Sequence, residues 1–351
     1  MSAKEIFVGE DKLKTSGGEI SGEIIKKGDE EFYKISNYDK MEPFLVSLAS
    51  SSDHWLYISS LGGLTAGRKN ADNALFPYVT DDKLHDNSEF TGAKTIILVE
   101  GEKGAKLWEP FSNRFDGVYS IKRNIYKNIS STKILFEEIN NDLKLVFRYG
   151  WTTGDRFGFV KFSEIKNISS IEQKVNILDG IENILPADVI NALQSGYSTL
   201  VNGYKKNELI EESGVGVFSL SSIPSDRAQP SESLRATTVF SCGVDVKSRL
   251  LSSTQLDNFR RGEDITEEKS IKGRKAAYFI QSEIQLEQSE NKEWYIVSEI
   301  NQNTGDVIDL NETVRSGSVF NEVKNDIEEN RNNLIKLIAK ADGLQLTSNK
   351  R

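Results

Sequence analysis

The stretch from residue 61 to residue 86, LGGLTAGRKNADNALFPYVTDDKLHD, is dense in side chains that could handle a ligand. It contains three glycines, a basic pair, several Asn and Asp residues, and an apolar knot from Leu75 to Tyr78. Two strand-like runs, HWLYISS and AKTIILVE, flank it. Connections in compact domains are about 4–6 residues long, and longer irregular ones are mostly functional or disordered. The composition therefore predicts either a flexible insertion or an ordered surface that binds a ligand.

Candidate acids and bases are present, but none forms a pattern typical of catalysis. His54 stands at the start of a predicted strand, where a structural role is more common than a catalytic one. His85 lies at the polar end of the 61–86 stretch, where it could touch a ligand, and a His acid with a Glu base could act at a sugar anomeric centre. Charged neighbours in loops are usually solvated, and this is the simplest interpretation of Asp81–Asp82, Glu137–Glu138 and Asp155–Arg156.

Several familiar sites are excluded by motif. The sequence has no G-x-x-x-x-G-K-[ST] phosphate loop, no H-E-x-x-H and no G-x-S-x-G elbow. The run GVGVFS from residue 214 lacks the third glycine of a dinucleotide-binding fingerprint. One cysteine and two histidines cannot assemble a usual structural zinc site. We therefore expect no metal and no cofactor.

Charge and hydropathy limit the partners. The 351 residues carry 53 acidic and 44 basic side chains, a net charge of −9, with no long basic block. Nucleic acids and anionic membrane surfaces are therefore disfavoured. No run approaches the roughly 18 apolar residues of a membrane span, the N-terminus has no apolar signal core, and the single Cys242 fits a reducing compartment. We expect a cytoplasmic protein, with a neutral or polar small ligand still open.

The elements that position these residues are mostly strands. Leu143, Leu145, Phe147 and Tyr149 alternate with Lys144 and Arg148, as on a half-buried strand. Similar runs occur at 55–59, 95–99, 133–136, 158–162, 174–178, 215–220, 237–240, 278–286 and 294–300. Many short β-branched and aromatic runs between turn clusters predict a mainly β, antiparallel sandwich. A doubly wound parallel sheet is disfavoured because strands and helices do not alternate.

Two segments have helical spacing. The first runs from Pro186 to Tyr204, and the second from Asn321 to Ala341, where Gly343 is expected to end the helix. The pattern of the second helix fits equally a cap on the sandwich and a linker toward a further domain.

Seven stretches together resemble one family. They are GGLTAGRKN (62–70), NALFPY (73–78), TDDK (80–83), KLWEPF (106–111), ILFEEIN (134–140), LDGIENILP (178–186) and SDRAQPSESL (225–234). In this order they resemble the N-terminal region of cellobiose-phosphorylase-like proteins, glycoside hydrolase family 94, formerly glycosyltransferase family 36. The resemblance covers about residues 40 to 320. Tyr78, Asp81-Asp82-Lys83 and Ser88-Glu89 replace a tryptophan, an Asn-Asp-Pro and a Gly-Glu of better-characterised members, which puts the identity of the sugar in doubt.

The resemblance implies a large β-supersandwich of the galactose-mutarotase type over 1–320, with one inserted helix. A helical linker over 321–351 would lead toward a catalytic (α/α)6 barrel that this chain does not contain, which favours the linker over the cap. The implied parent reaction is inverting phosphorolysis of a β-glycoside by inorganic phosphate in a homodimer. The chain itself would be non-catalytic, shaping the sugar site and the dimer interface.

The resemblance also gives the 61–86 stretch a role, because in that family loops of this domain reach toward the active site. Arg, Asn and Asp supply the donors and acceptors that sugar hydroxyls need, and an aromatic ring can stack on a sugar face. The predicted substrate-binding residues are Arg68, Asn70, Asn73, Tyr78, Asp81, Asp82 and Trp108. The alternatives are a freestanding sugar-binding or mutarotase-like protein and a purely structural dimerisation module.

Overall fold

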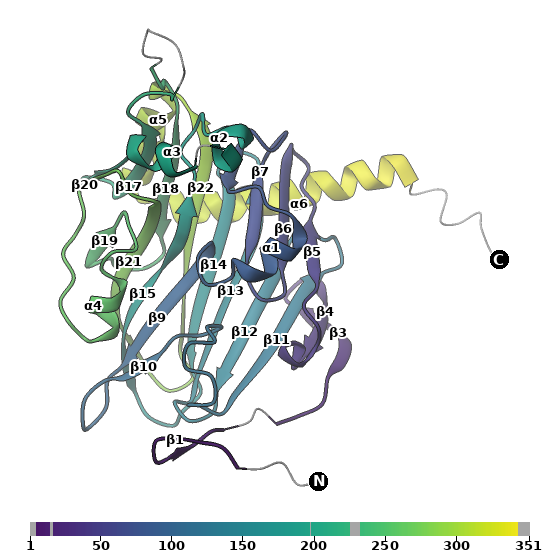
Figure 1. Cartoon of the computed structure of the whole chain (residues 1–351). Helices are drawn as coiled ribbons and strands as arrows, with labels where there is room; N and C mark the ends of the chain where they lie inside the picture. Colours follow the sequence, from purple (N-terminus) through teal and green to yellow (C-terminus); the bar gives the residue numbers. More distant parts are fainter. Residues whose placement is uncertain (1–4, 15–16, 197, 225–231, 343–351) are drawn as a thin grey trace.

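The computed structural model describes residues 5–14, 17–196, 198–224 and 232–342. Antiparallel strands form two facing layers, and a long helix, α6, crosses behind the larger one and extends beyond it (Figure 1). The predicted mainly β, large antiparallel sandwich is therefore confirmed.

One layer is a single eleven-stranded sheet, antiparallel at every described pairing. In spatial order its strands are β20 (Ser270–Lys272), β16 (Lys205–Ile210), β17 (Val215–Leu220), β18 (Ala236–Cys242), β22 (Asn291–Gln302), β14 (Gly158–Asn167), β13 (Leu145–Gly154), β12 (Ile134–Asn140), β11 (Ile121–Asn128), β4 (Glu30–Ser36) and β3 (Ser21–Lys27). We call this layer the large sheet.

The other layer is divided into two smaller sheets. The five-stranded sheet contains β10 (Lys106–Trp108), β9 (Gly92–Val99), β15 (Gln173–Ile184), β21 (Ala276–Leu286) and β19 (Ser248–Leu250). The four-stranded sheet contains β5 (Leu45–Leu48), β6 (His54–Ser59), β7 (Leu64–Arg68) and β8 (Ala74–Phe76). A separate short hairpin pairs β1 (Phe7–Val8) with β2 (Asp11–Lys12).

The core lies between the layers and follows from alternation along the strands. On β13, Leu145, Phe147, Tyr149 and Trp151 point inward and are at most 4% exposed, because successive residues face opposite sides of a sheet. Leu143, predicted on the same face, precedes the strand and is also buried. Each predicted strand range overlaps a strand of the structure.

A charged pair is enclosed in this core. Lys161 Nζ lies 2.6 Å from Asp179 Oδ1, and neither residue is exposed. The same carboxylate accepts hydrogen bonds from the side chains of Thr95 (2.6 Å), Ser163 (2.9 Å) and Trp294 (2.7 Å). A buried ion pair is tolerated when its hydrogen-bonding groups are satisfied in this way.

The predicted 186–204 helix is two short helices, α2 (Asn191–Gly196) and α3 (Ser198–Tyr204), with residue 197 outside the described residues. Three further helices were not predicted, α1 (Asp81–Asp86), α4 (Leu256–Arg260) and α5 (Thr304–Arg315), and Tyr38–Lys40 forms a 3₁₀ turn. Helix α6 (Val319–Asp342) confirms the C-terminal helix. Its expected stop, Gly343, lies outside the described residues, as do positions 225–231 of the SDRAQPSESL stretch.

Only the first half of α6 belongs to the sandwich. Val319, Val323 and Ile327 are buried against the outer face of the large sheet. Beyond them Ile335, Leu337 and Ile338 are each about half exposed, at 46%, 50% and 50%. No helix among the described residues is long and apolar enough to cross a membrane.

Candidate functional site

The 61–86 stretch is not a single long loop. It forms β7, a tight turn, β8 and a short helix, α1 (Asp81–Asp86). Helix α1 fits closely over the β6–β7 turn, since a side chain at Gly63 would come 2.2 Å from the carbonyl oxygen of Leu84. Ser59 Oγ on β6 lies 2.7 Å from His85 Nδ1 on α1. The stretch is therefore an ordered part of the four-stranded sheet and not a flexible insertion.

Arg68, at the end of β7, serves the fold. Its Nε donates to Glu299 Oε1 at 2.9 Å, its Nη2 also bonds that carboxylate, and its Nη1 donates to Asp53 at 2.7 Å. Burial raises the pKa of Glu299 above its ordinary value, against the lowering effect of Arg68. These bonds join the four-stranded sheet to β22, so both ends of the guanidinium are occupied by protein.

Asn70 and Asn73 complete the β7–β8 turn. Asn70 Oδ1 accepts from the backbone N–H of Asp72 (3.1 Å) and from Asn73 Nδ2 (2.8 Å), a turn bond typical of asparagine. Asn73 Oδ1 in turn accepts from Asn301 Nδ2 at 2.8 Å. These oxygens already have protein partners.

The remaining predicted residues are dispersed. Asp82 is exposed on α1 and accepts a hydrogen bond from Thr80 Oγ1 at 2.8 Å. This bond is the main reason that the pKa of Asp82 lies below its ordinary value. Asp81 is the first residue of the same helix. Trp108 is 2% exposed in the core and donates its indole N–H to Glu138 at 2.7 Å. An enclosed ring offers no surface for stacking, which corrects the expectation for Trp108.

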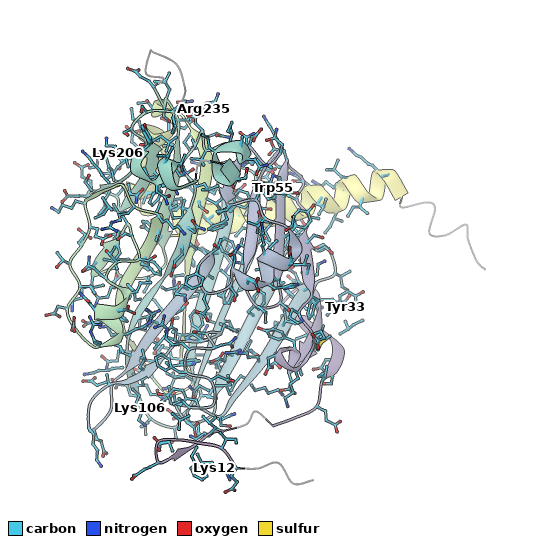
Figure 2. All side chains as sticks on the ribbon, in the orientation of Figure 1. Lys12, Tyr33, Trp55, Lys106, Lys206 and Arg235 are labelled. Atoms are coloured by element: carbon cyan, nitrogen blue, oxygen red, sulfur yellow. The ribbon has the colours of Figure 1, made fainter. Side chains whose placement is uncertain are left out.

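Tyr78 belongs to an aromatic cluster that the motif reasoning did not include. Trp55 lies next to two exposed tyrosines, Tyr57 (45% exposed) and Tyr78 (47%). The Trp55 ring centroid is 6.5 Å from that of Tyr57 and 5.7 Å from that of Tyr78. We call these three residues the aromatic face. Figure 2 places Trp55 near α2, toward the upper end of the four-stranded sheet.

The aromatic face is held in place from both sides. A side chain at Gly67 would come 2.5 Å from Trp55 Cζ2, so glycine leaves room for the indole. The backbone N–H of Tyr78 donates to Gln194 Oε1 on α2 at 3.0 Å. The sequence held a usable signal, because Trp55 and Tyr57 share one face of β6 while Leu56 and Ile58 are buried on the other.

The other candidate acids and bases have structural partners. Glu137 and Glu138 point to opposite faces of β12: Glu137 accepts from Tyr126 (2.6 Å) and Glu138 from Arg123 (2.8 Å), so they cannot act together on one substrate. Asp155 accepts from Asn330 on α6 at 2.8 Å. His54 Nδ1 lies 3.0 Å from Ser50 Oγ, and His85 Nδ1 lies 2.7 Å from Ser59 Oγ. Among the described residues, no cluster of three His, Cys, Asp or Glu side chains suits a metal ion.

Comparison with known proteins supports the architecture. No protein-family model matches the sequence, and no curated protein matches it either. A bacterial glucoamylase solved with acarbose has 9% identity and a TM-score of 0.50, over 96% of this chain and 41% of that one. A putative kojibiose phosphorylase from the human microbiome (11% identity, TM-score 0.35, 84% and 30% covered) and a putative aldose 1-epimerase from Klebsiella pneumoniae (8%, TM-score 0.34, 85% and 91%) are also similar.

At this identity the glucoamylase shows the fold alone, and the two lower TM-scores carry no argument. The class defined by the structure is a mainly β antiparallel supersandwich with a C-terminal helix. The chain spans about two fifths of the length of the glucoamylase chain.

Proposed function

We propose that this chain is a non-catalytic, carbohydrate-associated sandwich domain of a glycoside phosphorylase, and that its aromatic face contacts the sugar. The observation that carries the proposal is the exposure of Tyr57 and Tyr78 next to Trp55. Tyrosine and tryptophan present an apolar face with a polar edge, which suits a sugar ring that is apolar on its faces and hydroxylated around its rim.

The resemblance of the 62–70, 73–78 and 80–83 stretches to cellobiose-phosphorylase-like proteins supports the finer part of the proposal. The parent enzyme would act on an oligosaccharide with inorganic phosphate, as a homodimer. The projecting half of α6 supports a connection to another domain, because half-exposed Ile335, Leu337 and Ile338 form an apolar surface that a neighbouring domain would cover. The coding sequence beyond residue 351 tests this connection: a continued helical frame supports it, and a stop codon contradicts it.

Isothermal titration with glucose and neutral disaccharides tests the aromatic face. Each ring is expected to contribute about 1 kcal/mol, so Tyr57→Ala with Tyr78→Ala should weaken saturable binding by roughly thirtyfold. Tyr33→Ala is the matched control, because Tyr33 is also an exposed tyrosine (53%) but belongs to another sheet. It lies on β4 of the large sheet, and Figure 2 shows it apart from Trp55. Equal loss in the control and the double variant would refute a specific role for the aromatic face.

A further inference from the structure

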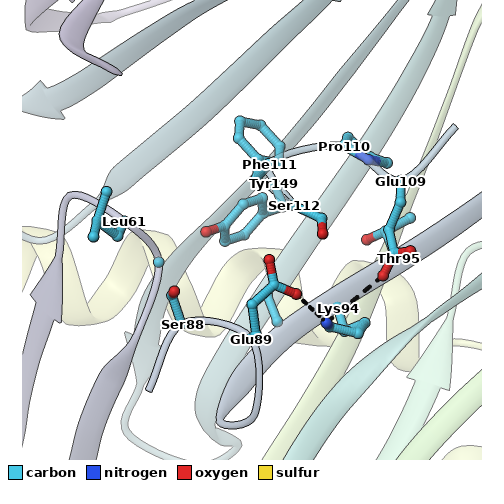
Figure 3. A pocket seen from close by; sticks show the side chains of 12 residues that line it. Leu61, Ser88, Glu89, Lys94, Thr95, Glu109, Pro110, Phe111, Ser112 and Tyr149 are labelled. Atoms are coloured by element: carbon cyan, nitrogen blue, oxygen red, sulfur yellow. Dashed lines mark hydrogen bonds and ion pairs between the residues drawn. The ribbon is translucent and has the colours of Figure 1, made fainter. Parts of the chain in front are cut away.

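A small pocket lies at the junction of the two smaller sheets (Figure 3). Leu61 and Gly62 come from the β6–β7 turn of the four-stranded sheet, Lys94 comes from β9 of the five-stranded sheet, and Tyr149 rises from the large sheet beneath. The loop after β10 closes another side with Ser112. We call this space the junction pocket.

The polar groups of the junction pocket include one with no protein partner. Lys94 Nζ lies 2.7 Å from Glu89 Oε2 and 3.6 Å from Glu109 Oε1, so the charges are paired. The hydroxyl of Tyr149 makes no hydrogen bond to another described residue, although Tyr149 is only 4% exposed. Burial raises the pKa of this phenol well above its ordinary value, so the hydroxyl stays protonated and able to donate. Because Tyr149 lines the pocket, water or a ligand in the pocket can bond this hydroxyl.

The charges around the pocket select a neutral guest. Lys94 is paired with Glu89 and Glu109, and Glu109 is also paired with Arg260 (2.7 Å), so the charges compensate one another and leave no counter-charge for a charged guest. Ser112 Oγ already accepts from the backbone N–H of Arg114 (3.1 Å), and Glu89 accepts from Lys94 (2.7 Å) and from the backbone N–H of Asn113 (3.1 Å). The groups left for a guest are the Tyr149 hydroxyl, which can donate and accept, and the remaining lone pairs of these oxygens. A hydroxyl group, which also both donates and accepts, matches this set.

The size of the pocket limits how much of a guest can enter. A side chain at Gly62 would come 2.9 Å from the Tyr149 hydroxyl, so glycine keeps this wall clear. The remaining space suits about one water-sized group and no sugar ring. Of the hydroxyls on a hexopyranose, only the exocyclic hydroxymethyl extends far enough from the ring to enter while the ring stays outside.

We propose that the junction pocket receives the hydroxymethyl group of a hexose residue, whose oxygen hydrogen-bonds Tyr149. The inference rests on the carbohydrate role proposed above but concerns a separate set of residues, because none of Trp55, Tyr57 and Tyr78 lines the junction pocket. The chemical class it selects is hexosyl over pentosyl ligands.

Ligand-observed NMR titration of the full chain with glucose and with xylose, which has the same ring without the hydroxymethyl, tests the proposal. The wild type is expected to bind glucose about tenfold more tightly. Tyr149→Phe removes only the hydroxyl, and should bring glucose affinity down to that of xylose while leaving xylose unchanged. Tyr126→Phe is the matched control, since its hydroxyl bonds Glu137 on the other face of the large sheet.

The outcomes separate this inference from the proposed function. Equal affinity for the two sugars, or an unchanged glucose affinity in Tyr149→Phe, would show that the pocket holds solvent only. If glucose binding is lost in the Tyr57→Ala and Tyr78→Ala double variant but not in Tyr149→Phe, the aromatic face is supported and the pocket proposal is overturned. Loss in Tyr149→Phe alone would support the pocket and overturn the aromatic face. No glucose binding by the wild type would overturn both.

Discussion

Arg68 and Glu299 are 231 positions apart in sequence, yet the guanidinium of Arg68 donates two hydrogen bonds to the Glu299 carboxylate, one of them at 2.9 Å. The pair ties β7 to β22, and Glu299 is 9% exposed. A side chain that the sequence suggested for a ligand thus joins two sheets of the sandwich.

We expect Arg68→Ala to lower the free energy of unfolding by about 3 kcal/mol, because it leaves a buried carboxylate without its counter-charge. Urea denaturation measures this. Glu299→Gln in the same chain should restore part of the loss, since the neutral amide is less costly to bury. If Arg68→Ala instead lowered sugar affinity without changing stability, Arg68 would be a sugar-binding residue and not a structural one.

His54 predicts a pH dependence of stability. Its Nε2 is buried without a described partner, its ring lies 5.0 Å from that of Phe159, and burial lowers its pKa from 6.5 to about 4. Between these two pH values the unfolded chain binds a proton at His54 and the folded chain does not. The free energy of unfolding is therefore unaffected by His54 above pH 6.5 and falls as pH decreases toward 4.

His54→Gln should therefore lose less stability than the wild type between pH 7 and pH 4.5, by about 2–3 kcal/mol. Chemical denaturation at both pH values measures the difference. Parallel pH profiles for the two proteins would exclude His54 as the cause.

Asp179→Ala should be among the most destabilising single substitutions. It would leave the Lys161 ammonium in the core without a counter-charge, and burial already lowers the pKa of that lysine. We expect a loss of about 3–5 kcal/mol, measured by thermal or urea denaturation. Lys161→Met with Asp179→Leu should be milder than Asp179→Ala alone. A double variant as unstable as the single one would contradict the role of the unpaired charge.

Asp326 anchors α6 to the β13–β14 turn. Its carboxylate accepts from the backbone N–H groups of Asp155, Arg156 and Phe157 at 3.0–3.1 Å. A side chain at Gly154 would come 2.0 Å from Asp326 Oδ2, so the turn needs glycine there.

Asp326→Ala should cost about 2 kcal/mol and speed proteolytic cleavage within α6, followed by mass spectrometry. Glu329→Ala is the control, because Glu329 is exposed on the same helix. Identical cleavage rates in the two variants would argue against the anchor.

The sequence by itself determined ten of the 22 strands in the described residues, the antiparallel sandwich and the C-terminal helix, because period-two and helical patterns are local. Most of the strands that were not predicted are short or lie at sheet edges. It also contained a signal for α5 that went unused: Asn303 and Asp306 form a reciprocal capping box, with Asn303 Oδ1 accepting from Gly305 N–H at 2.8 Å.

Only the tertiary structure decided which polar side chains are bonded within the protein. The local sequence around Arg68 cannot show that its partner is Glu299, nor that Trp108 donates to Glu138 inside the core, since both contacts join distant strands. The same long-range pairing gathers Leu61, Lys94 and Tyr149 around one pocket. Alternation tells which face of a strand is buried, whereas the order of strands in the sheets determines what that face meets.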